Sequence, residues 1–466
     1  MAGEWAGRRA IVLGLGHFGG GLGVARWLLS QGASVLVTDR ASPESLAAPA
    51  AELAALGARL VLGGHAGVDF TATDLLVVNP AVPADAPPLA AARAAGVRIS
   101  TEIGLLIERW PGPVVGITGS NGKSTTTSLT HAVLRAAGAP AELGGNIGGS
   151  LLERLDEVPP RSIAVLELSS FMLELLAPAG LLPDVAVITN ITPNHLDRHG
   201  SFEAYKAAKR AILGRARHAV LCGDDAVVRE VAAGWGGHAL WYGRRGEMSV
   251  NTAGDLVDRR GWIVLDSAQI PLPGRANRLN LAAATLAAAA VLGDEVRAMR
   301  ALPAALAHYE LPPHRLQTVG TWQGVAWVDD SVSTTPESTA ASLAALGAGC
   351  VLIAGGHDKG LDPEPLLTAA TRHARVVLLV GEQGPRLLRD LTRRGVTAEL
   401  VQTVPAAVVR AAQLAQAGES VLLSPGYSSH DQFTNYEQRA AVFREHVLLQ
   451  ARRAAPGPAR HADATG

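Results

Sequence analysis

The feature that most constrains this chain is a glycine-rich loop between an apolar run and a helix-like segment rich in serine and threonine. Residues 114–127 read VVGITGSNGKSTTT. A strand, such a loop and a helix in succession are typical of phosphate sites, because backbone N–H groups and the helix dipole together bind an anion. We expect N–H groups from Gly119 to Lys123 to form the nest, Lys123 to hold the β- and γ-phosphates, and Ser124 to offer its hydroxyl to Mg²⁺. A plain glycine-rich turn is the less favoured alternative.

The glycines of this loop depart from the usual pattern, G-x-x-x-x-G-K-[ST]. By that count, the place of the first glycine is taken by Ile117, with Gly116 and Gly119 on either side. The loop alone therefore indicates a nucleotide and leaves its use open.

Two further apolar runs of the same region end in residues that suit catalysis. Glu167 lies near the end of AVLELSS (164–170), and His195 and Asp197 follow VAVITN (185–190). Carboxyl ends of parallel strands line the ligand crevice, so Lys123, Glu167 and His195 should converge there. A carboxylate beside a triphosphate suits Mg²⁺. A lone histidine is more often a capping or core residue, but this position favours a functional role.

Lysine is scarce in this chain. Only four of its 41 lysine and arginine residues are lysines, so a lysine that is present can have a task that arginine cannot perform. Lys206 and Lys209 lie three residues apart in EAYKAAKRAIL (203–213) and share a helix face. Two ordinary surface lysines are the alternative.

The N-terminus contains a dinucleotide-type pattern, GLGHFG (14–19), with Asp39 at the end of the next apolar run. This signal is weak, since any diphosphate can use glycines and a helix N-terminus in this way. A tight turn without a ligand and a nicotinamide oxidoreductase both remain alternatives, although the latter explains nothing after residue 113.

Apolar runs alternate with helical stretches along the chain, which indicates parallel α/β units. Its 466 residues are too many for one core. The net charge of −1 and the lack of a basic block argue against nucleic-acid binding. No run is suited to a bilayer, and two cysteines far apart favour a reducing cytoplasm. Polar sequence at 234–274 suggests an antiparallel excursion.

Several motifs occur together in one order along nearly the whole chain. They are GITGSNGKST, GGNIGG (144–149), LELSSF, TPNHLDRH, YKAAK, LPGRANRLNLAAA (272–284), PPHRL and LSPGYSSHDQFTNYEQ (423–438). This set resembles the Mur ligases, ATP-dependent amide-forming enzymes of peptidoglycan synthesis. LELSSF and the last motif are most similar to the branch that adds D-glutamate to UDP-N-acetylmuramoyl-L-alanine through an acyl phosphate.

The resemblance implies an α/β protein of three domains. These are a Rossmann-like domain for the UDP substrate (1–111), a P-loop-type ATPase domain with a mostly parallel sheet (112–311) and a Rossmann-like domain for the amino acid (312–452). Residues 453–466 are expected to be a disordered tail. The implied cofactors are ATP and Mg²⁺, and the implied enzyme is a cytoplasmic monomer.

The resemblance also assigns residues by position. The catalytic set is Lys123, Glu167, His195 and Lys209, and Lys209 matches the family lysine that becomes a carbamate. The metal set is Ser124, Glu167, His195 and Lys209. The ATP set is Gly119, Ser120, Asn121, Gly122, Lys123, Ser124, Thr125, Asn280, Arg315 and Asp330. The substrate set is Gly16, Asp39, Asn146, Thr334, Lys359, Ser429 and Tyr436.

Two departures from the family pattern leave alternatives open. The motif commonly written D-S-K-A-T-N reads DSVSTT at 330–335, so Val332 replaces a frequent lysine. In the first domain, His17, Phe18 and additional glycines alter the diphosphate turn. Addition of L-glutamate, or of another amino acid by a related ligase, is therefore the alternative to addition of D-glutamate.

Overall fold

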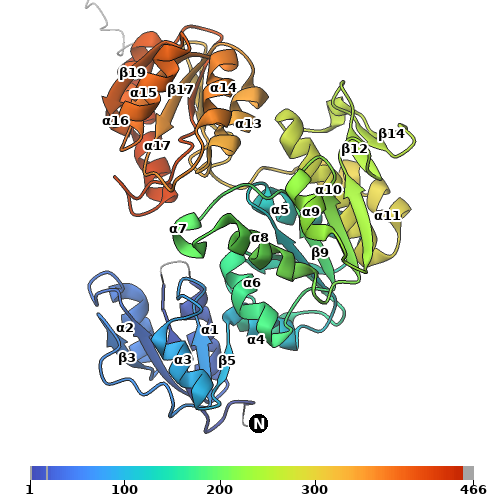
Figure 1. Ribbon diagram of the computed structural model, residues 1–466, viewed down its shortest axis with the longest axis vertical. Coiled ribbons are helices and arrows are strands. Elements are labelled where there is room, and N and C mark those ends of the chain that lie inside the picture. Colours follow the sequence, from blue (N-terminus) through green and yellow to red (C-terminus); the bar gives the residue numbers. More distant parts are fainter. Residues whose placement is uncertain (1–2, 17–18, 455–466) are drawn as a thin grey trace, which may run out of the picture. The chain divides into compact units, whose positions relative to one another are not determined.

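The computed structural model describes residues 3–16 and 19–454, and its strands form three sheets (Figure 1). Contacts divide the chain into two compact units. The first comprises Met1–Thr192, Glu203–Ile270 and Leu279–Tyr309, and the second comprises Pro193–Phe202, Pro271–Arg278 and the chain from Glu310 onward. The first unit contains two of the sheets and the second unit contains the third.

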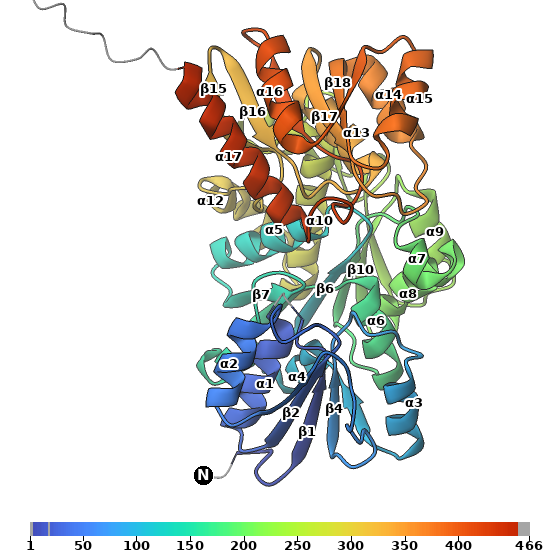
Figure 2. The same ribbon diagram turned by 90° about the vertical axis from the view of Figure 1, so that its left-hand side faces the viewer.

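The N-terminal sheet has five parallel strands in the order β3-β2-β1-β4-β5. Helices α1 and α2 lie on one side of it and α3 lies on the other (Figure 2). This is the Rossmann-like arrangement that the sequence predicts. The strands are β1 (Arg9–Leu13), β2 (Ser34–Asp39), β3 (Arg59–Leu62), β4 (Leu75–Val78) and β5 (Arg98–Ser100), and the helices are α1 (Gly20–Ser30), α2 (Ala47–Ala55), α3 (Pro87–Ala94) and α4 (Glu102–Arg109).

The central sheet has nine strands in the order β14-β13-β12-β11-β10-β9-β6-β8-β7. Its pairs are parallel except for β12–β13 and β13–β14, which confirms the mostly parallel sheet and the antiparallel excursion. The strands are β6 (Val114–Thr118), β7 (Ala141–Gly145), β8 (Ile163–Glu167), β9 (Val185–Ile188), β10 (His218–Cys222), β11 (His238–Tyr242), β12 (Met248–Val250), β13 (Leu256–Asp258) and β14 (Ile263–Leu265).

Eight α-helices lie between β6 and β15 in the chain. They are α5 (Lys123–Ala136), α6 (Ser170–Leu176), α7 (Leu196–His199), α8 (Phe202–Arg210), α9 (Ala226–Ala232), α10 (Gly274–Leu292), α11 (Glu295–Arg300) and α12 (Leu302–Leu306), with short 3₁₀ helices at Leu152–Glu157, Ala177–Ala179, Ala211–Leu213 and Ser267–Gln269. Because β6, β8 and β9 are parallel neighbours, their carboxyl ends lie at one edge of the sheet.

The C-terminal sheet has the order β15-β16-β20-β17-β18-β19, with five parallel strands and the antiparallel edge strand β15. It is therefore a mixed sheet, and its five parallel strands agree with the Rossmann-like domain that the sequence predicts. The strands are β15 (Gln317–Trp322), β16 (Val325–Asp329), β17 (Cys350–Gly355), β18 (Ala374–Val380), β19 (Ala398–Gln402) and β20 (Ser420–Leu423), and the helices are α13 (Pro336–Leu346), α14 (Glu364–His373), α15 (Gly384–Arg393), α16 (Val404–Leu414) and α17 (Tyr436–Ala454).

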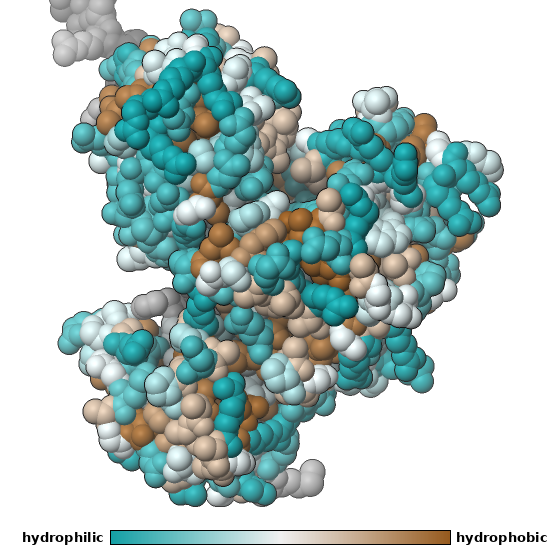
Figure 3. Space-filling view, in the orientation of Figure 1, coloured by the Kyte–Doolittle hydropathy of each residue, from teal (hydrophilic) through white to brown (hydrophobic). Residues whose placement is uncertain are grey.

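Alternation along β17 gives this domain two cores. Val351 and Ile353 pack with residues of α16 and α17, whereas Leu352 and Ala354 pack with residues of α13, α14 and α15. Outer helix surfaces of this domain are largely hydrophilic on the face drawn in Figure 3. Within the described ranges, no helix combines the length and the apolar character that crossing a bilayer requires.

Helix α17 continues to Ala454, so the first two residues of the expected tail are helical. The remaining tail, residues 455–466, lies outside the described residues, as do His17 and Phe18.

Candidate active site

The phosphate-loop candidate connects β6 to α5, and two of its glycines are required by geometry. Gly119 has φ 153°, and a Cβ atom there would lie 1.8 Å from Oγ1 of Thr189. Gly122 has φ 83°, and its Cβ would lie 2.6 Å from Oδ1 of Asn280. Ile117 is instead a fully buried strand residue. The loop therefore needs its glycine at 119 and not at 117, which explains the shifted pattern.

Thr189 and Asn190, which follow β9, hold this loop in shape. Thr189 Oγ1 and Asn190 Nδ2 both donate to the Asn121 carbonyl, at 2.6 and 2.8 Å. The N–H groups of Ser120 and Asn121 donate to the Asn190 carbonyl and to its Oδ1, at 2.8 and 2.9 Å. Because these two N–H groups are already engaged, the anion-binding nest is narrower than the predicted span from Gly119 to Lys123.

The Ser120 side chain is also engaged within the protein. Its Oγ donates to the Thr192 carbonyl at 2.9 Å, accepts from the Thr192 N–H at 2.9 Å and lies 3.0 Å from the Tyr205 hydroxyl. Thr189, Asn190 and Tyr205 are supporting residues that the motifs do not single out. Thr189 and Asn190 do carry a signal in the sequence, since they are polar residues directly after the buried strand β9, whereas Tyr205 lies on α8.

Lys123 begins α5, and its Nζ donates to the carbonyls of Gly119 and Ser120, both at 3.1 Å. The Lys123 ammonium thus lies beside the loop with which it is predicted to bind phosphates. Ser124 and Thr125 follow in the first turn of the helix, and Thr125 Oγ1 is a buried hydroxyl without a hydrogen-bond partner.

Lys209 is the most deeply buried lysine of the described residues. It is 1% exposed, and its Nζ donates to the Gly119 carbonyl at 2.7 Å and to Thr118 Oγ1 at 3.3 Å. Nζ also lies 4.7 Å from the centre of the Tyr205 ring. Burial, reinforced by the charge of Lys123, lowers the pKa of Lys209 well below its usual value, while Glu167 opposes this.

Lys206, one turn earlier on α8, has the opposite surroundings. Its Nζ lies 2.7 Å from carboxylates of both Glu203 and Glu230. These two hydrogen-bonded carboxylates raise the pKa of Lys206. The structure therefore gives the two lysines different surroundings: Lys206 pairs with two exposed carboxylates, whereas Lys209 is a buried amine beside the phosphate-loop candidate.

Glu167 ends β8 and is 2% exposed. Its Oε1 accepts a hydrogen bond from Asn146 Nδ2 at 3.1 Å, and the Asn146 N–H donates to the Glu167 carbonyl at 2.9 Å. Oε2 is buried without a hydrogen-bond partner. A buried carboxylate oxygen without a donor is costly unless something else, such as a cation, occupies the space beside it.

These residues suit Mg²⁺, a hard cation that keeps few protein ligands and takes phosphate oxygens and water as well. In the described part of the chain, no three His, Cys, Asp or Glu side chains group into a metal site. A cation beside Glu167 would therefore depend on oxygens that a nucleotide and a modified Lys209 bring.

His195 precedes α7 in the left-handed region, with φ 54°, and its N–H donates to Asn194 Oδ1 at 2.9 Å. It belongs to the second compact unit, whereas Lys123, Glu167 and Lys209 belong to the first. The approach of His195 to those residues remains a prediction.

Gly16 and Asp39 of the predicted UDP site line one cavity of about 440 Å³ at the carboxyl ends of β1 and β2. Asp39 Oδ2 accepts from the N–H groups of Leu15 and Gly16, at 2.7 and 3.1 Å. The carboxylate thus shapes the glycine turn. The cavity combines apolar walls with charged groups, as a nucleoside diphosphate requires; further lining residues include Arg40, His65, Asn79, Val82, Asp85, Pro83, Pro87 and Pro88.

The remaining predicted residues lie in the C-terminal domain. Ser429 is 3% exposed, Thr334 is partly buried, and burial lowers the pKa of Lys359. Asp330 is fully buried, and its Oδ2 accepts from the Ser342 and Ser424 hydroxyls at 2.7 Å each. The Asp330 carboxylate is therefore not exposed for its predicted contact with ATP in this conformation.

Three family models match consecutive parts of the chain. Residues 8–101 match a model described as Mur ligase MurD-like, N-terminal domain. Residues 117–288 match the Mur ligase middle domain, and residues 314–426 match the Mur ligase, glutamate ligase domain.

Curated relatives match over nearly the full length. The UDP-N-acetylmuramoylalanine--D-glutamate ligase of Symbiobacterium thermophilum is 37% identical over 460 residues, which cover 96% of this chain and 99% of that protein. The protein of the same name from a Roseiflexus species is 38% identical over 468 residues, with coverage of 95% and 99%.

Solved structures agree at the level of the fold. MurC from Thermotoga maritima matches with a TM-score of 0.62 at 19% identity, covering 95% of this chain and 100% of that one. MurF from Acinetobacter baumannii also gives 0.62 at 19% identity, with coverage of 94% and 93%. By its full-length relatives, the chain belongs to the Mur ligase family and, within it, to the UDP-N-acetylmuramoylalanine--D-glutamate ligases.

Proposed function

We propose that the protein catalyses the ATP-dependent addition of D-glutamate to UDP-N-acetylmuramoyl-L-alanine in peptidoglycan precursor synthesis. The observation that carries the proposal is the grouping, at one edge of the central sheet, of the phosphate loop, the Glu167–Asn146 pair and the buried amine of Lys209. The names of the full-length relatives favour D-glutamate over the L-glutamate alternative.

In this proposal, the alanine carboxylate of the substrate attacks the γ-phosphoryl group of ATP, and ADP leaves. The glutamate amine then attacks the acyl phosphate, losing a proton as the amide forms and phosphate leaves. Attack of one anion on another needs charge neutralisation and positioning more than covalent help from the protein. Lys123, at the N-terminus of α5, supplies one positive charge at the phosphates.

Ser124, Glu167, His195 and a carbamate on Lys209 would hold Mg²⁺. When bound, Mg²⁺ supplies charge neutralisation at the phosphate oxygens. Asn146 holds Oε1 of Glu167, which leaves Oε2 for the cation.

The environment of Lys209 supports its carbamylation. Only a neutral amine captures CO₂, and burial beside the positive charge of Lys123 favours the neutral form. The amine nitrogen bonds to the carbon of CO₂ and releases one proton. The product is a carboxylate-like group on a long arm, which arginine cannot provide.

The other predicted residues would each bind a different part of the substrates. Gly16 and Asp39 would receive the UDP part in the N-terminal cavity, and Asn146 the muramoyl part. Asn280, Arg315 and Asp330 would add ATP contacts to those of the loop. The carboxylate of the glutamate side chain would be received by Lys359, Thr334, Ser429 and the backbone at Tyr436.

Free ATP, a UDP-sugar substrate and two unpaired, buried thiols fit a cytoplasmic enzyme. We also expect a monomer, which size-exclusion chromatography with light scattering will test.

The proposal is tested by phosphate release from ATP with UDP-N-acetylmuramoyl-L-alanine and, in turn, D-Glu, L-Glu, D-Asp and L-Lys. We expect turnover with D-Glu far above that with the other three. Preferential turnover of L-Glu would replace the proposed specificity, and no turnover with any of the four would reject the proposed reaction. Titration with NAD(P)H should show no tight binding, because the nicotinamide alternative rests on the 14–19 turn and Asp39 alone.

A further inference from the structure

The segment that carries Arg315 has an unusual backbone. His314 and Leu316, on either side of Arg315, have φ of 61° and 43°. The left-handed region costs a residue with a side chain about 1 kcal/mol or more, so a pair of such residues persists only where other contacts hold it. The contacts that hold this segment therefore decide where Arg315 lies.

Two neighbouring carboxylates at the end of β16 supply such contacts. His314 Nδ1 lies 2.8 Å from Oδ2 of Asp329, which is fully buried, and the Leu316 N–H donates to Asp330 Oδ1 at 3.2 Å. Burial raises the pKa of Asp329, but its hydrogen bonds with His314, Ser331 and Arg444 outweigh this and lower it. Asp329 is therefore an acceptor at neutral pH, and Nδ1 of His314 carries the hydrogen.

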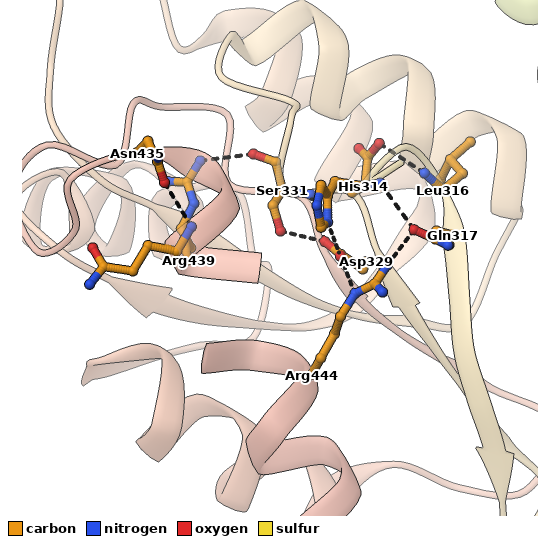
Figure 4. Close-up of polar contacts among 10 residues, drawn as sticks. His314, Leu316, Gln317, Asp329, Ser331, Asn435, Arg439 and Arg444 are labelled. Carbon is orange, nitrogen blue, oxygen red and sulfur yellow. Dashed lines mark hydrogen bonds and ion pairs between the residues drawn. The ribbon is translucent and has the colours of Figure 1, made fainter. Parts of the chain in front are cut away.

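Arg444 of α17 completes a closed set of contacts with these groups (Figure 4). Its Nε donates to the same Asp329 Oδ2 at 2.9 Å, and its Nη2 donates to Oε1 of Gln317. That Gln317 oxygen also accepts the His314 N–H at 3.1 Å. The ring of His314 is thus fixed by Asp329, its backbone is fixed by Gln317, and Arg444 links these two acceptors.

The segment 314–316 contains one residue predicted to contact a substrate, Arg315, and touches another, Tyr436. Arg315 Nε is buried and has no hydrogen-bond partner among the described residues, as expected of a donor that binds an anion. The ring of His314 also meets Tyr436, a predicted glutamate contact, edge to face at a centroid distance of 6.1 Å. A shift of His314 would therefore move both Arg315 and the support of Tyr436.

We propose that Asp329 and Arg444 are positioning residues, which act through His314 to hold Arg315 in the orientation that binds ATP. This inference rests on the proposed function, because Arg315 is taken there as an ATP contact. Neither residue is expected to touch a substrate, because the Asp329 carboxylate already accepts hydrogen bonds from His314, Ser331 and Arg444.

The test compares Asp329→Asn, Arg444→Ala and Arg444→Lys with Arg452→Ala, a matched removal of an exposed arginine from the same helix. Steady-state kinetics gives kcat and the KM of each of the three substrates, and thermal unfolding confirms that each variant is folded at the assay temperature. We expect Asp329→Asn and Arg444→Ala to raise the KM for ATP about tenfold, with a much smaller effect on the KM for the UDP substrate. Arg444→Lys should recover part of the loss, and Arg452→Ala should match the unmodified enzyme.

The double variant Asp329→Asn/Arg444→Ala gives a second test. If the two residues act through one contact set, the double variant should lose little more than the worse single variant. An unchanged KM for ATP in both single variants would overturn the inference. So would equal increases of all three KM values together with a lower melting temperature, because that pattern indicates a general structural role.

Failure of the proposed function is distinguishable from failure of this inference. If the unmodified protein does not turn over D-Glu, the reaction is wrong, and equilibrium titration with a fluorescent ATP analogue still measures the effect of Asp329→Asn on nucleotide affinity. Asp329→Asn keeps the shape of the side chain, so it tests the inference even if Arg444→Ala does not fold.

Discussion

At the scale of single residues, the pair Lys206 and Lys209 shows how surroundings separate chemically identical groups. Both belong to α8, and they are three residues apart. Two carboxylates hold Lys206, whereas the amine of Lys209 has only neutral oxygen acceptors, at Gly119 and Thr118. Lysine scarcity alone leaves the two equivalent, and the family resemblance points to Lys209. The fold adds that Lys209 is the more deeply buried of the two.

We therefore expect Lys209→Ala to lower kcat at least about 100-fold, because the proposed carbamate and its charge cannot form. Added short carboxylates such as acetate should restore part of the activity by filling the vacated space. Lys206→Ala is the matched control and should retain activity within about twofold, since both carboxylate partners of Lys206 are exposed and ion pairs with exposed groups contribute little. Phosphate release measures both, and full activity of Lys209→Ala would exclude the carbamate role.

Glu102 provides a residue-scale prediction on stability. It starts α4, and its Oε1 accepts from the Ser150 hydroxyl at 2.6 Å. Burial raises its pKa to about 7, the Ser150 hydrogen bond opposes this, and Glu153 adds to it. Because the pKa is raised in the folded protein, the contribution of Glu102 to the free energy of unfolding is fully present below pH 4.5, the pKa of this carboxyl in the unfolded chain. This contribution is lost as the pH rises through about 7.

Glu102→Gln removes this titration while it keeps a side chain of similar size. We expect the variant to lose less stability than the unmodified protein between pH 5 and 8, by about 2 kcal/mol at most, since the residue is only partly buried. Urea unfolding at a series of pH values measures the difference. Parallel pH profiles of the two proteins would contradict the prediction.

At the scale of elements, the sequence predicts most of what local pattern controls. The run VVGIT coincides with β6, and the runs before Glu167 and His195 are the parallel neighbours β8 and β9. Hydrophobic runs flanked by glycine and polar residues suffice for this. Short or partly exposed strands such as β3, β15 and β19 carry a pattern too weak to predict them from the sequence.

Contacts between elements could not be predicted from the sequence. The hydrogen bonds from Thr189 and Asn190 to Asn121 join residues 68 and 69 positions apart, and the contact between Arg444 and Asp329 spans 115 positions. No periodicity within one element encodes such pairs. A single sequence marks the groups that can carry out chemistry, and the packing of strand ends then determines what holds them.

The support of the phosphate loop by β9 yields an element-scale prediction. Thr189→Val keeps the shape of a buried side chain but removes its hydrogen bond to the Asn121 carbonyl. We expect a KM for ATP that is raised about five- to tenfold with a small change in melting temperature, because the loop loses one support. Thr130→Val is the control, since this equally buried hydroxyl only bonds the Thr126 carbonyl of its own helix. Equal effects of both variants on the KM for ATP would refute the support role.

At the scale of the whole molecule, each compact unit contains one cysteine: Cys222 ends β10 in the first unit, and Cys350 begins β17 in the second. Both thiols are buried, at 8% and 2% exposure. Burial raises the pKa of Cys222, and it raises that of Cys350 to about 12. A disulfide reagent at pH 8 should therefore react slowly with the folded protein, and the thiols should become reactive as their units unfold.

Single-cysteine variants, Cys222→Ala and Cys350→Ala, then report the unfolding of each unit separately in a urea series. Separate cores need not unfold together, so we expect two different midpoints. UDP-N-acetylmuramoyl-L-alanine should raise the midpoint that Cys222 reports more than the one that Cys350 reports, because the cavity proposed to bind it, with Gly16 and Asp39, belongs to the first unit, and ligands stabilise the part that they bind. Coincident midpoints that shift together would instead show that the two units unfold as one, and each ligand would then stabilise the whole chain.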